Sequence, residues 1–224
     1  MAITYLSGGR IQGRSDDSLD ATADFTEDFS ETTPTTWTED SSSGYANNLE
    51  PYKGSVNRLW FDMDYTDTVK TSGTLDLANG SYGIGATPSD TAWVLRWKQR
   101  FTTITQNAGS LMWIGLTEHP SSTNIDQTGD SIVLRWYNAS GAEWFQLDGG
   151  GGGTMNNQYS THGALATYAL NTDYYFEMSR DGATATVTAR TGSHSGTTVN
   201  TQTRTYSTSP EDLRYLRVTN YGAD

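Results

Sequence analysis

The sequence predicts an all-β protein, folded as a two-sheet antiparallel β-sandwich of the jelly-roll type. Short stretches alternate apolar and polar residues, which is the period of a half-buried strand. β-Branched and aromatic residues dominate these stretches, whereas no window of helical length shows a 3.6-residue period. Clusters of Ser, Thr, Asn, Gly and Asp separate the stretches. Many short strands with regular turns and no helices indicate a sandwich or barrel.

The predicted strands follow one another along the chain, each from one alternating stretch. They cover residues 58–64, 92–103, 110–117, 130–138, 143–148, 172–180, 183–191, 197–206 and 213–220, with weaker candidates in 25–37 and 73–77. Asp181-Gly182 stands between two of these stretches and favours a tight hairpin turn. Residues 1–24 are polar and aperiodic, so we expect an N-terminal arm or linker before one domain spanning 25–224.

The composition fits one domain of this kind. The chain has 224 residues, 12% aromatic residues, no Cys and a net charge of −12. An all-β domain of this length can bury a sizeable core. The absence of Cys excludes disulfides, thiolate metal sites and a Cys nucleophile. The negative charge argues against nucleic acid and anionic membranes as partners. The apolar stretch 1–6 is too short for a signal-peptide core, and no stretch approaches the roughly 18 apolar residues of a membrane span.

Side-chain alternation assigns faces to the predicted strands. The core face of 92–103 carries Trp93, Leu95, Trp97 and Phe101, and its other face carries Arg96, Lys98 and Arg100. In 110–117 the core face carries Met112, Ile114 and Leu116, and the opposite face carries Trp113, Gly115 and Thr117. A glycine at position 115 is expected to let a ligand approach the sheet closely.

The strands 130–138 and 143–148 allow their register to be predicted as well. A short loop at 139–142 pairs Tyr137 with Trp144, Arg135 with Gln146, and Val133 with Asp148. The other face then pairs Trp136 with Phe145 and Leu134 with Leu147. A slip of one residue would mix the apolar and polar sets, so the pattern favours this register.

The outward face of the predicted sheet combines flat aromatic rings with planar hydrogen-bonding groups. It comprises Arg96, Lys98, Arg100, Trp113, Arg135, Tyr137, Trp144, Gln146 and Asp148. Sugar rings pack on aromatic faces while amides, carboxylates and guanidiniums bind their hydroxyls, so these residues are predicted to bind a polysaccharide. Arginine also holds carboxylates and sulfates through paired bonds, which favours an anionic polymer. An ordinary solvated sheet face is the alternative.

Motifs for catalysis and metal binding are sparse. The chain lacks the Glu-x-Asp-x-x-Glu strand of sandwich glucanases, and only Asp62 and Asp64 form a partial carboxylate pair. His119, His162 and His194 lie in Gly-, Ser- or Pro-rich contexts typical of loops. Among them His162 is a candidate ligand contact, because the loop 155–168 could fold over the sheet. Acidic side chains near one end could bind calcium through oxygen ligands; the candidates are Asp24, Glu27 and Asp28.

Several stretches together resemble a known superfamily. They are 92–98, 101–105, 111–116, 174–182, 183–190 and 213–218. Over about 25–220 their texture resembles the concanavalin A-like lectin/glucanase superfamily in its laminin-G-like form. The resemblance implies a jelly roll whose concave sheet binds glycans, often with a structural calcium ion. Similar domains occur on phage and archaeal-virus surface proteins, so an extracellular or virion-surface location is expected.

Three functions are compatible with these observations. The leading hypothesis is a non-catalytic, lectin-like module that binds a polysaccharide on the concave sheet. The second is a polysaccharide lyase or glycoside hydrolase on the same fold; its candidate residues are Asp62, Asp64, Arg135, Tyr137 and His162. The third is a structural virion or cell-surface protein. Fold alone does not decide among them.

Overall fold

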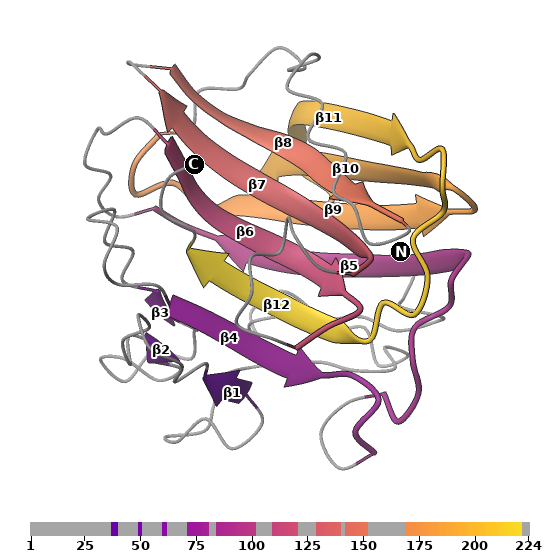
Figure 1. The fold of residues 1–224 in the computed structure, drawn as a ribbon. Coiled ribbons are helices and arrows are strands. Elements are labelled where there is room, and N and C mark those ends of the chain that lie inside the picture. The colour runs from indigo at the N-terminus through magenta and orange to yellow at the C-terminus, as the bar shows by residue number, and fades with distance from the viewer. Residues whose placement is uncertain are drawn as a thin grey trace.

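The protein folds as an antiparallel β-sandwich, which confirms the predicted fold class (Figure 1). The computed structural model describes residues 37–39, 49–50, 60–61, 71–80, 84–101, 109–120, 129–139, 142–151 and 169–220. Within these ranges every regular element is a strand. None of the described residues forms a helix that is long and apolar enough to cross a membrane.

Two main sheets form the two layers of the sandwich. The six-stranded sheet has the order β1 (Trp37–Glu39), β4 (Thr71–Asp76), β12 (Tyr215–Asn220), β6 (Gly109–Thr117), β7 (Ser131–Ala139), β8 (Ala142–Gly150). The four-stranded sheet has the order β11 (Thr197–Thr205), β10 (Thr184–Thr191), β9 (Tyr174–Asp181), β5 (Ala92–Gln99). A small ribbon pairs β2 (Leu49–Glu50) with β3 (Trp60–Phe61). All pairings are antiparallel, and β12 from the end of the chain lies between β4 and β6.

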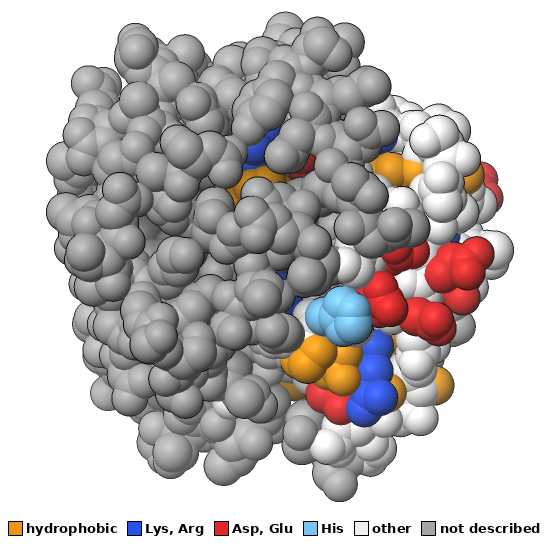
Figure 2. All heavy atoms as spheres, in the orientation of Figure 1, with side chains coloured by type: hydrophobic (Ala, Val, Ile, Leu, Met, Phe, Trp, Pro, Cys, Tyr) orange, Lys and Arg blue, Asp and Glu red, His pale blue; other side chains and the backbone are white. Residues whose placement is uncertain are grey.

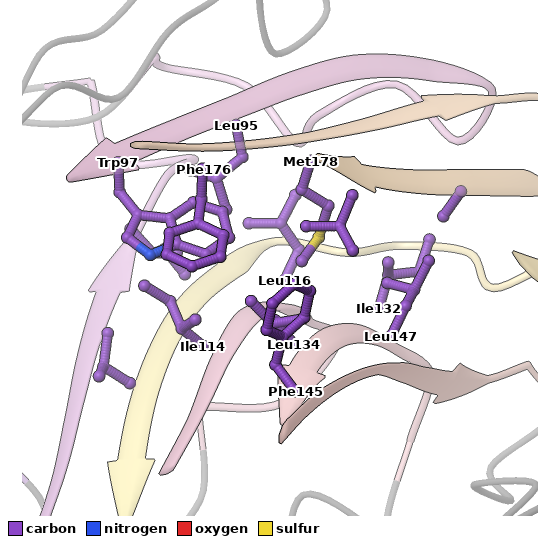
Figure 3. Packing of buried hydrophobic residues seen from close by; sticks show 14 of the residues in the cluster. Leu95, Trp97, Ile114, Leu116, Ile132, Leu134, Phe145, Leu147, Phe176 and Met178 are labelled. Carbon is purple, nitrogen blue, oxygen red and sulfur yellow. The ribbon is translucent and has the colours of Figure 1, made fainter. Parts of the chain in front are cut away.

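The core lies between the two sheets and is built from the predicted inward faces. In Figure 3, Leu95, Phe176 and Met178 of the four-stranded sheet point toward apolar side chains of the six-stranded sheet. Trp136 is fully buried, and its ring meets Phe145 at 5.2 Å and Phe176 at 5.2 Å between centroids. Because Phe145 and Phe176 belong to different sheets, Trp136 joins the two layers.

Both predicted hairpins are present. The register of β7 and β8 pairs Tyr137 with Trp144 and Arg135 with Gln146, as the sequence predicts. In the second hairpin Asp181 pairs with Thr184, so Gly182 occupies the first central position of a two-residue turn. Its φ of 58° is a left-handed conformation that glycine adopts without steric cost.

The outer edge of β8 is closed by side chains of β11 rather than by another strand. Gln202 donates from Nε2 to the carbonyl oxygen of Phe145 (2.6 Å) and accepts from the amide of Leu147 (2.9 Å). The hydroxyl of Tyr206, just beyond β11, donates to the carbonyl oxygen of Asp148 (3.1 Å). These bonds satisfy backbone groups that an open sheet edge would leave exposed.

Candidate ligand-binding faces

The structure divides the predicted polar and aromatic surface between the two sheets. Trp113, Arg135, Gln146 and Asp148 lie on the outer face of the six-stranded sheet. Arg96 and Lys98 belong to β5 and lie on the outer face of the four-stranded sheet. The expectation of one shared face is therefore wrong for these two residues. Alternation along a strand distinguishes the core-facing side from the outer side, but a sandwich has two outer faces, one on each sheet.

On the outer face of the six-stranded sheet, cross-strand neighbours form two rows that run across the strands. These rows include the predicted residues. The first row is Thr219, Trp113, Arg135 and Gln146, and the second is Arg217, Gly115, Val133 and Asp148. We call the eight residues the polar face. Its side chains are buried: Trp113 is 3% exposed, Gln146 5% and Asp148 1%. The polar face is thus a buried layer of charged, amide and aromatic groups, unlike the solvated face of an ordinary antiparallel sheet.

Asp148 is the centre of an ion-pair network on this face. Its carboxylate lies 2.8 Å from Arg204 Nη1 and 3.3 Å from Arg135 Nη2. Arg135 Nη2 also donates to Oε1 of Gln146 at 3.1 Å. Burial is the largest influence on the carboxyl and raises the pKa of Asp148 above its usual value, although both arginines act in the opposite direction. A buried carboxylate with a raised pKa and specific charged partners is a feature typical of functional sites.

Trp113 lies beside this network. The guanidinium carbon of Arg135 is 5.0 Å from the centroid of its ring, a cation–π distance. Its indole Nε1 is buried and has no hydrogen-bond partner in the structure as described. Trp93 also has a buried Nε1 without a partner, but it lies in the apolar core. The unused donor of Trp113 instead stands among charged and amide groups.

Position 115 requires a glycine for a reason other than the predicted close approach of a ligand. A Cβ atom at this position would lie 2.2 Å from the carbonyl oxygen of Ile132 and 2.6 Å from the Cα of Val133. Both atoms are backbone of the neighbouring strand β7, so they cannot rotate away. The close approach that requires glycine is therefore that of β7 itself.

The same outer surface is exposed at the end where β12 begins. Tyr215 lies between Asp76 and Thr117 in register and is partly exposed. Arg214 binds Asp76 through two bonds of 2.8 and 2.7 Å, and its guanidinium carbon lies 5.2 Å from the centroid of the Tyr215 ring. Figure 2 shows acidic side chains gathered beside a histidine on the described surface, with basic and hydrophobic side chains next to them.

The other predicted site residues are only partly covered by the structure. Tyr137 and Trp144 are paired across β7 and β8, in the row that follows Arg135 and Gln146, but their side chains lie outside the described part. The candidates for calcium (Asp24, Glu27, Asp28), for ligand contact (His162) and for catalysis (Asp62, Asp64) lie outside the described residues altogether. Among the residues that are described, no group of three or more His, Asp or Glu side chains could hold a metal ion.

The outer face of the four-stranded sheet has two distinct parts. Threonines of β10 and β11 face each other in three pairs, with hydroxyl oxygens 3.0 to 3.3 Å apart: Thr184 with Thr205, Thr186 with Thr203, and Thr188 with Thr201. The second part lies on β5, β9 and the end of β10, and comprises Arg96, Lys98, Tyr175, Glu177 and Arg190. We call this second part the basic end.

Sequence reasoning did not single out Tyr175, Arg190 or Tyr215 as site residues. Each lies in a predicted strand, so its existence on a sheet face was foreseeable. The residues beside them on adjacent strands could not be predicted, because β12 pairs with β4 and β6, and β9 pairs with β5, across long stretches of chain. A pairing between distant strands leaves no local signal.

Comparisons with known proteins leave the family of this chain open. No protein-family model matches it, and no curated protein matches it. Among solved structures it is similar to the CBM2 module of the evolved Dit of Lactobacillus casei BL23 phage J-1, at 15% identity and a TM-score of 0.49. That match covers 88% of this chain and 86% of the other. The resemblance to the concanavalin A-like superfamily stays a prediction, and the function proposed below rests on the residues of this chain.

Proposed function

We propose that this protein is a non-catalytic polysaccharide-binding module whose ligand is held by the polar face of the six-stranded sheet. One observation carries the proposal: the indole N–H of Trp113 is buried without a partner in the same row as Arg135 and Gln146. A buried donor without an acceptor costs free energy. A sugar hydroxyl supplies that acceptor, and its other bonds can go to the amide and guanidinium of the same row.

The surroundings of Trp113 support a sugar more than a purely apolar ligand. Tyr137 and Trp144 are the next cross-strand pair in register after Arg135 and Gln146, and we propose that they are further aromatic contacts of the sugar. This combination of a large apolar area with a few polar groups is typical of small-molecule and glycan sites. Toward the other end, Tyr215 is accessible at the surface, and we propose that it is the outermost aromatic contact.

The experiment compares Trp113→Phe with Trp93→Phe in affinity electrophoresis and calorimetry against a panel of soluble polysaccharides, with cleavage monitored in parallel. Both variants remove a buried N–H that has no partner and leave a small cavity, so a similar, modest loss of stability is expected in both. Only Trp113→Phe should weaken binding, by about fivefold to tenfold, since one hydrogen bond of about 1 kcal/mol is lost. Trp144→Ala should weaken binding by about tenfold or more with little change in Tm.

The outcomes separate the three hypotheses. If Trp113→Phe and Trp93→Phe bound polysaccharide with equal affinity, the polar face would not be the binding site. New reducing ends or unsaturated products would favour the enzyme, for which Asp62, Asp64 and His162 are the first variants to make. An absence of binding to every polymer would favour a structural role. The anionic character of the ligand and its location at a cell or virion surface are likewise proposals, tested by including acidic polymers in the panel.

A further inference from the structure

The basic end of the four-stranded sheet is a compact array around one aromatic ring. Tyr175 lies between Arg190 of β10 and Lys98 of β5 in register. Next along β9, Glu177 lies between Thr188 and Arg96. The ammonium of Lys98 is 5.2 Å from the centroid of the Tyr175 ring. Three cationic side chains and one carboxylate thus share two neighbouring rows.

This array is positive in a chain whose net charge is −12. Glu177 neutralises Arg96, to which it is bound through Nε and Nη2. At the border, Asp173 binds both Lys98 at 2.9 Å and Arg100 at 2.5 Å. Burial alone would lower the pKa of Lys98, but bonds to Asp173 and Tyr175 raise it above its usual value, so the ammonium stays charged. Cations therefore outnumber carboxylates across the basic end and its border.

Two guanidinium nitrogens of the basic end have no acceptor. Arg96 is 8% exposed, and two of its three nitrogens bind Glu177. The third, Nη1, is buried and has no hydrogen-bond partner in the described structure. Nη1 of Arg190 is also buried and has no hydrogen-bond partner in the described structure. Leaving a charged donor buried without an acceptor costs more than leaving a neutral one, so two on one face indicate that an acceptor belongs there.

A hairpin loop borders this array. The turn between β10 and β11 contains Gly192, with a φ of 87°, and brings His194 against Tyr175. The two rings meet edge to face with centroids 5.3 Å apart. The loop thus places an aromatic side chain beside the strand that carries Arg190. The basic end has a defined border on the loop side, which a flat solvated sheet lacks.

We propose that the basic end binds an oxyanion group, a sulfate, phosphate or carboxylate, between Arg96, Arg190 and Lys98. The guanidinium forks match the paired oxygens of such groups, and Lys98 adds a point charge. The ligand oxygens supply the acceptors that both Nη1 atoms lack. This site is on the opposite outer face from the polar face, so it is independent of the polysaccharide site proposed above.

The test measures binding of dextran sulfate, polygalacturonate and inorganic sulfate by calorimetry, with uncharged dextran as the blank. Arg190→Gln removes a guanidinium whose Nη1 is buried without a partner, so its Tm should match the wild type. Arg190→Lys keeps the charge but loses the fork. Arg214→Gln is the charge-matched control, because it removes one exposed arginine that directly precedes β12 of the other sheet.

The expected result is that wild type binds at least one sulfate or carboxylate probe and Arg190→Gln weakens it by about tenfold or more. Arg190→Lys should fall between the two, and Arg214→Gln should bind like the wild type. Binding of inorganic sulfate would identify a free ion as a sufficient ligand, and binding of only the polymers would identify a polymer-borne group.

Two results would overturn the site. In the first, no probe binds to the wild type, which would mean that water satisfies the buried nitrogens. In the second, Arg190→Gln and Arg214→Gln weaken binding equally, which would mean that only overall charge matters. Should Arg190→Gln lower the Tm, Lys98→Gln repeats the comparison with the other partly exposed cation of the basic end.

Discussion

Asp173 shows how one carboxylate can serve two cations on a sheet face. It lies 2.9 Å from the ammonium of Lys98 and 2.5 Å from Nε of Arg100. Burial alone would raise the pKa of Asp173, but its bonds to Arg100 and Lys98 outweigh burial and lower it below 3.8. The folded protein therefore holds this proton more weakly than the unfolded chain. The stabilisation from Asp173 is present above pH 3.8 and is lost as the pH falls below it.

Asp173→Asn should accordingly destabilise the protein at neutral pH and not in acid. At pH 7 we expect a loss of up to about 1 kcal/mol, the upper range for partly exposed pairs. The difference from the wild type should shrink below pH 3.8. Urea unfolding at pH 7, 5 and 3 measures it, with the exposed Asp181→Asn as the control. A difference that stays constant down to pH 3 would contradict the role of this ion pair.

The position of a residue relative to the core was predictable from sequence, whereas its environment was not. Trp93, Leu95 and Trp97 were assigned to the core from alternation alone, and all are buried there. Trp113 was correctly placed on the opposite face but was expected to be exposed, and it is buried. Alternation reports direction from the sheet plane, and it carries no information about what lies above that plane.

At the scale of elements, β11 has an unusual double role. Its outward threonines pair with those of β10, while Gln202 binds the backbone of β8 on the inward side. The strand thereby belongs to the four-stranded sheet and closes the edge of the six-stranded one. Side chains thus protect this sheet edge, a role that a further strand or charged edge residues have in other sandwiches.

Gln202→Leu should therefore destabilise the sandwich although it replaces a polar side chain by an apolar one. It leaves the carbonyl of Phe145 and the amide of Leu147 without their partner. We expect a loss of about 2 kcal/mol or more in chemical unfolding and faster hydrogen exchange of the Leu147 amide. Thr198→Val, exposed on the same strand and outside the three threonine pairs, should change stability by less than about 0.5 kcal/mol. Unchanged exchange at Leu147 would show that the edge is closed by other means.

At the scale of the whole molecule, the described residues form a hydrophobic core that both sheets share. Trp136 contacts Phe101 and Phe145 as well as Phe176 of the opposite sheet, and Trp97 stacks on Phe176 at 4.9 Å. Aromatic rings from both layers thus pack on one another in this shared core. Both sheets are therefore expected to unfold together.

Trp136→Ala should consequently weaken the whole fold and not one layer. Truncating a fully buried tryptophan costs about 3–5 kcal/mol. Near-UV and far-UV circular dichroism should shift to lower denaturant together and stay superimposed. Val199→Ala, at an exposed apolar position, is the control and should shift neither curve by more than about 0.5 kcal/mol. Separate transitions in the two spectra would mean that the sheets are independent.

The sequence by itself determined the class of fold, the strands β5 to β12, their inward faces and the two hairpins β7–β8 and β9–β10, whereas it missed the short strand β2. These features are local: a period of two residues and an Asp-Gly turn act within one or two neighbouring strands. The tertiary structure decided which sheet each strand joins, and so separated Arg96 and Lys98 from Trp113, Arg135 and Gln146. It also decided that β12 lies between β4 and β6 and that the polar face is buried. Pairing between strands far apart in the chain depends on how whole surfaces pack, which no short stretch of residues encodes.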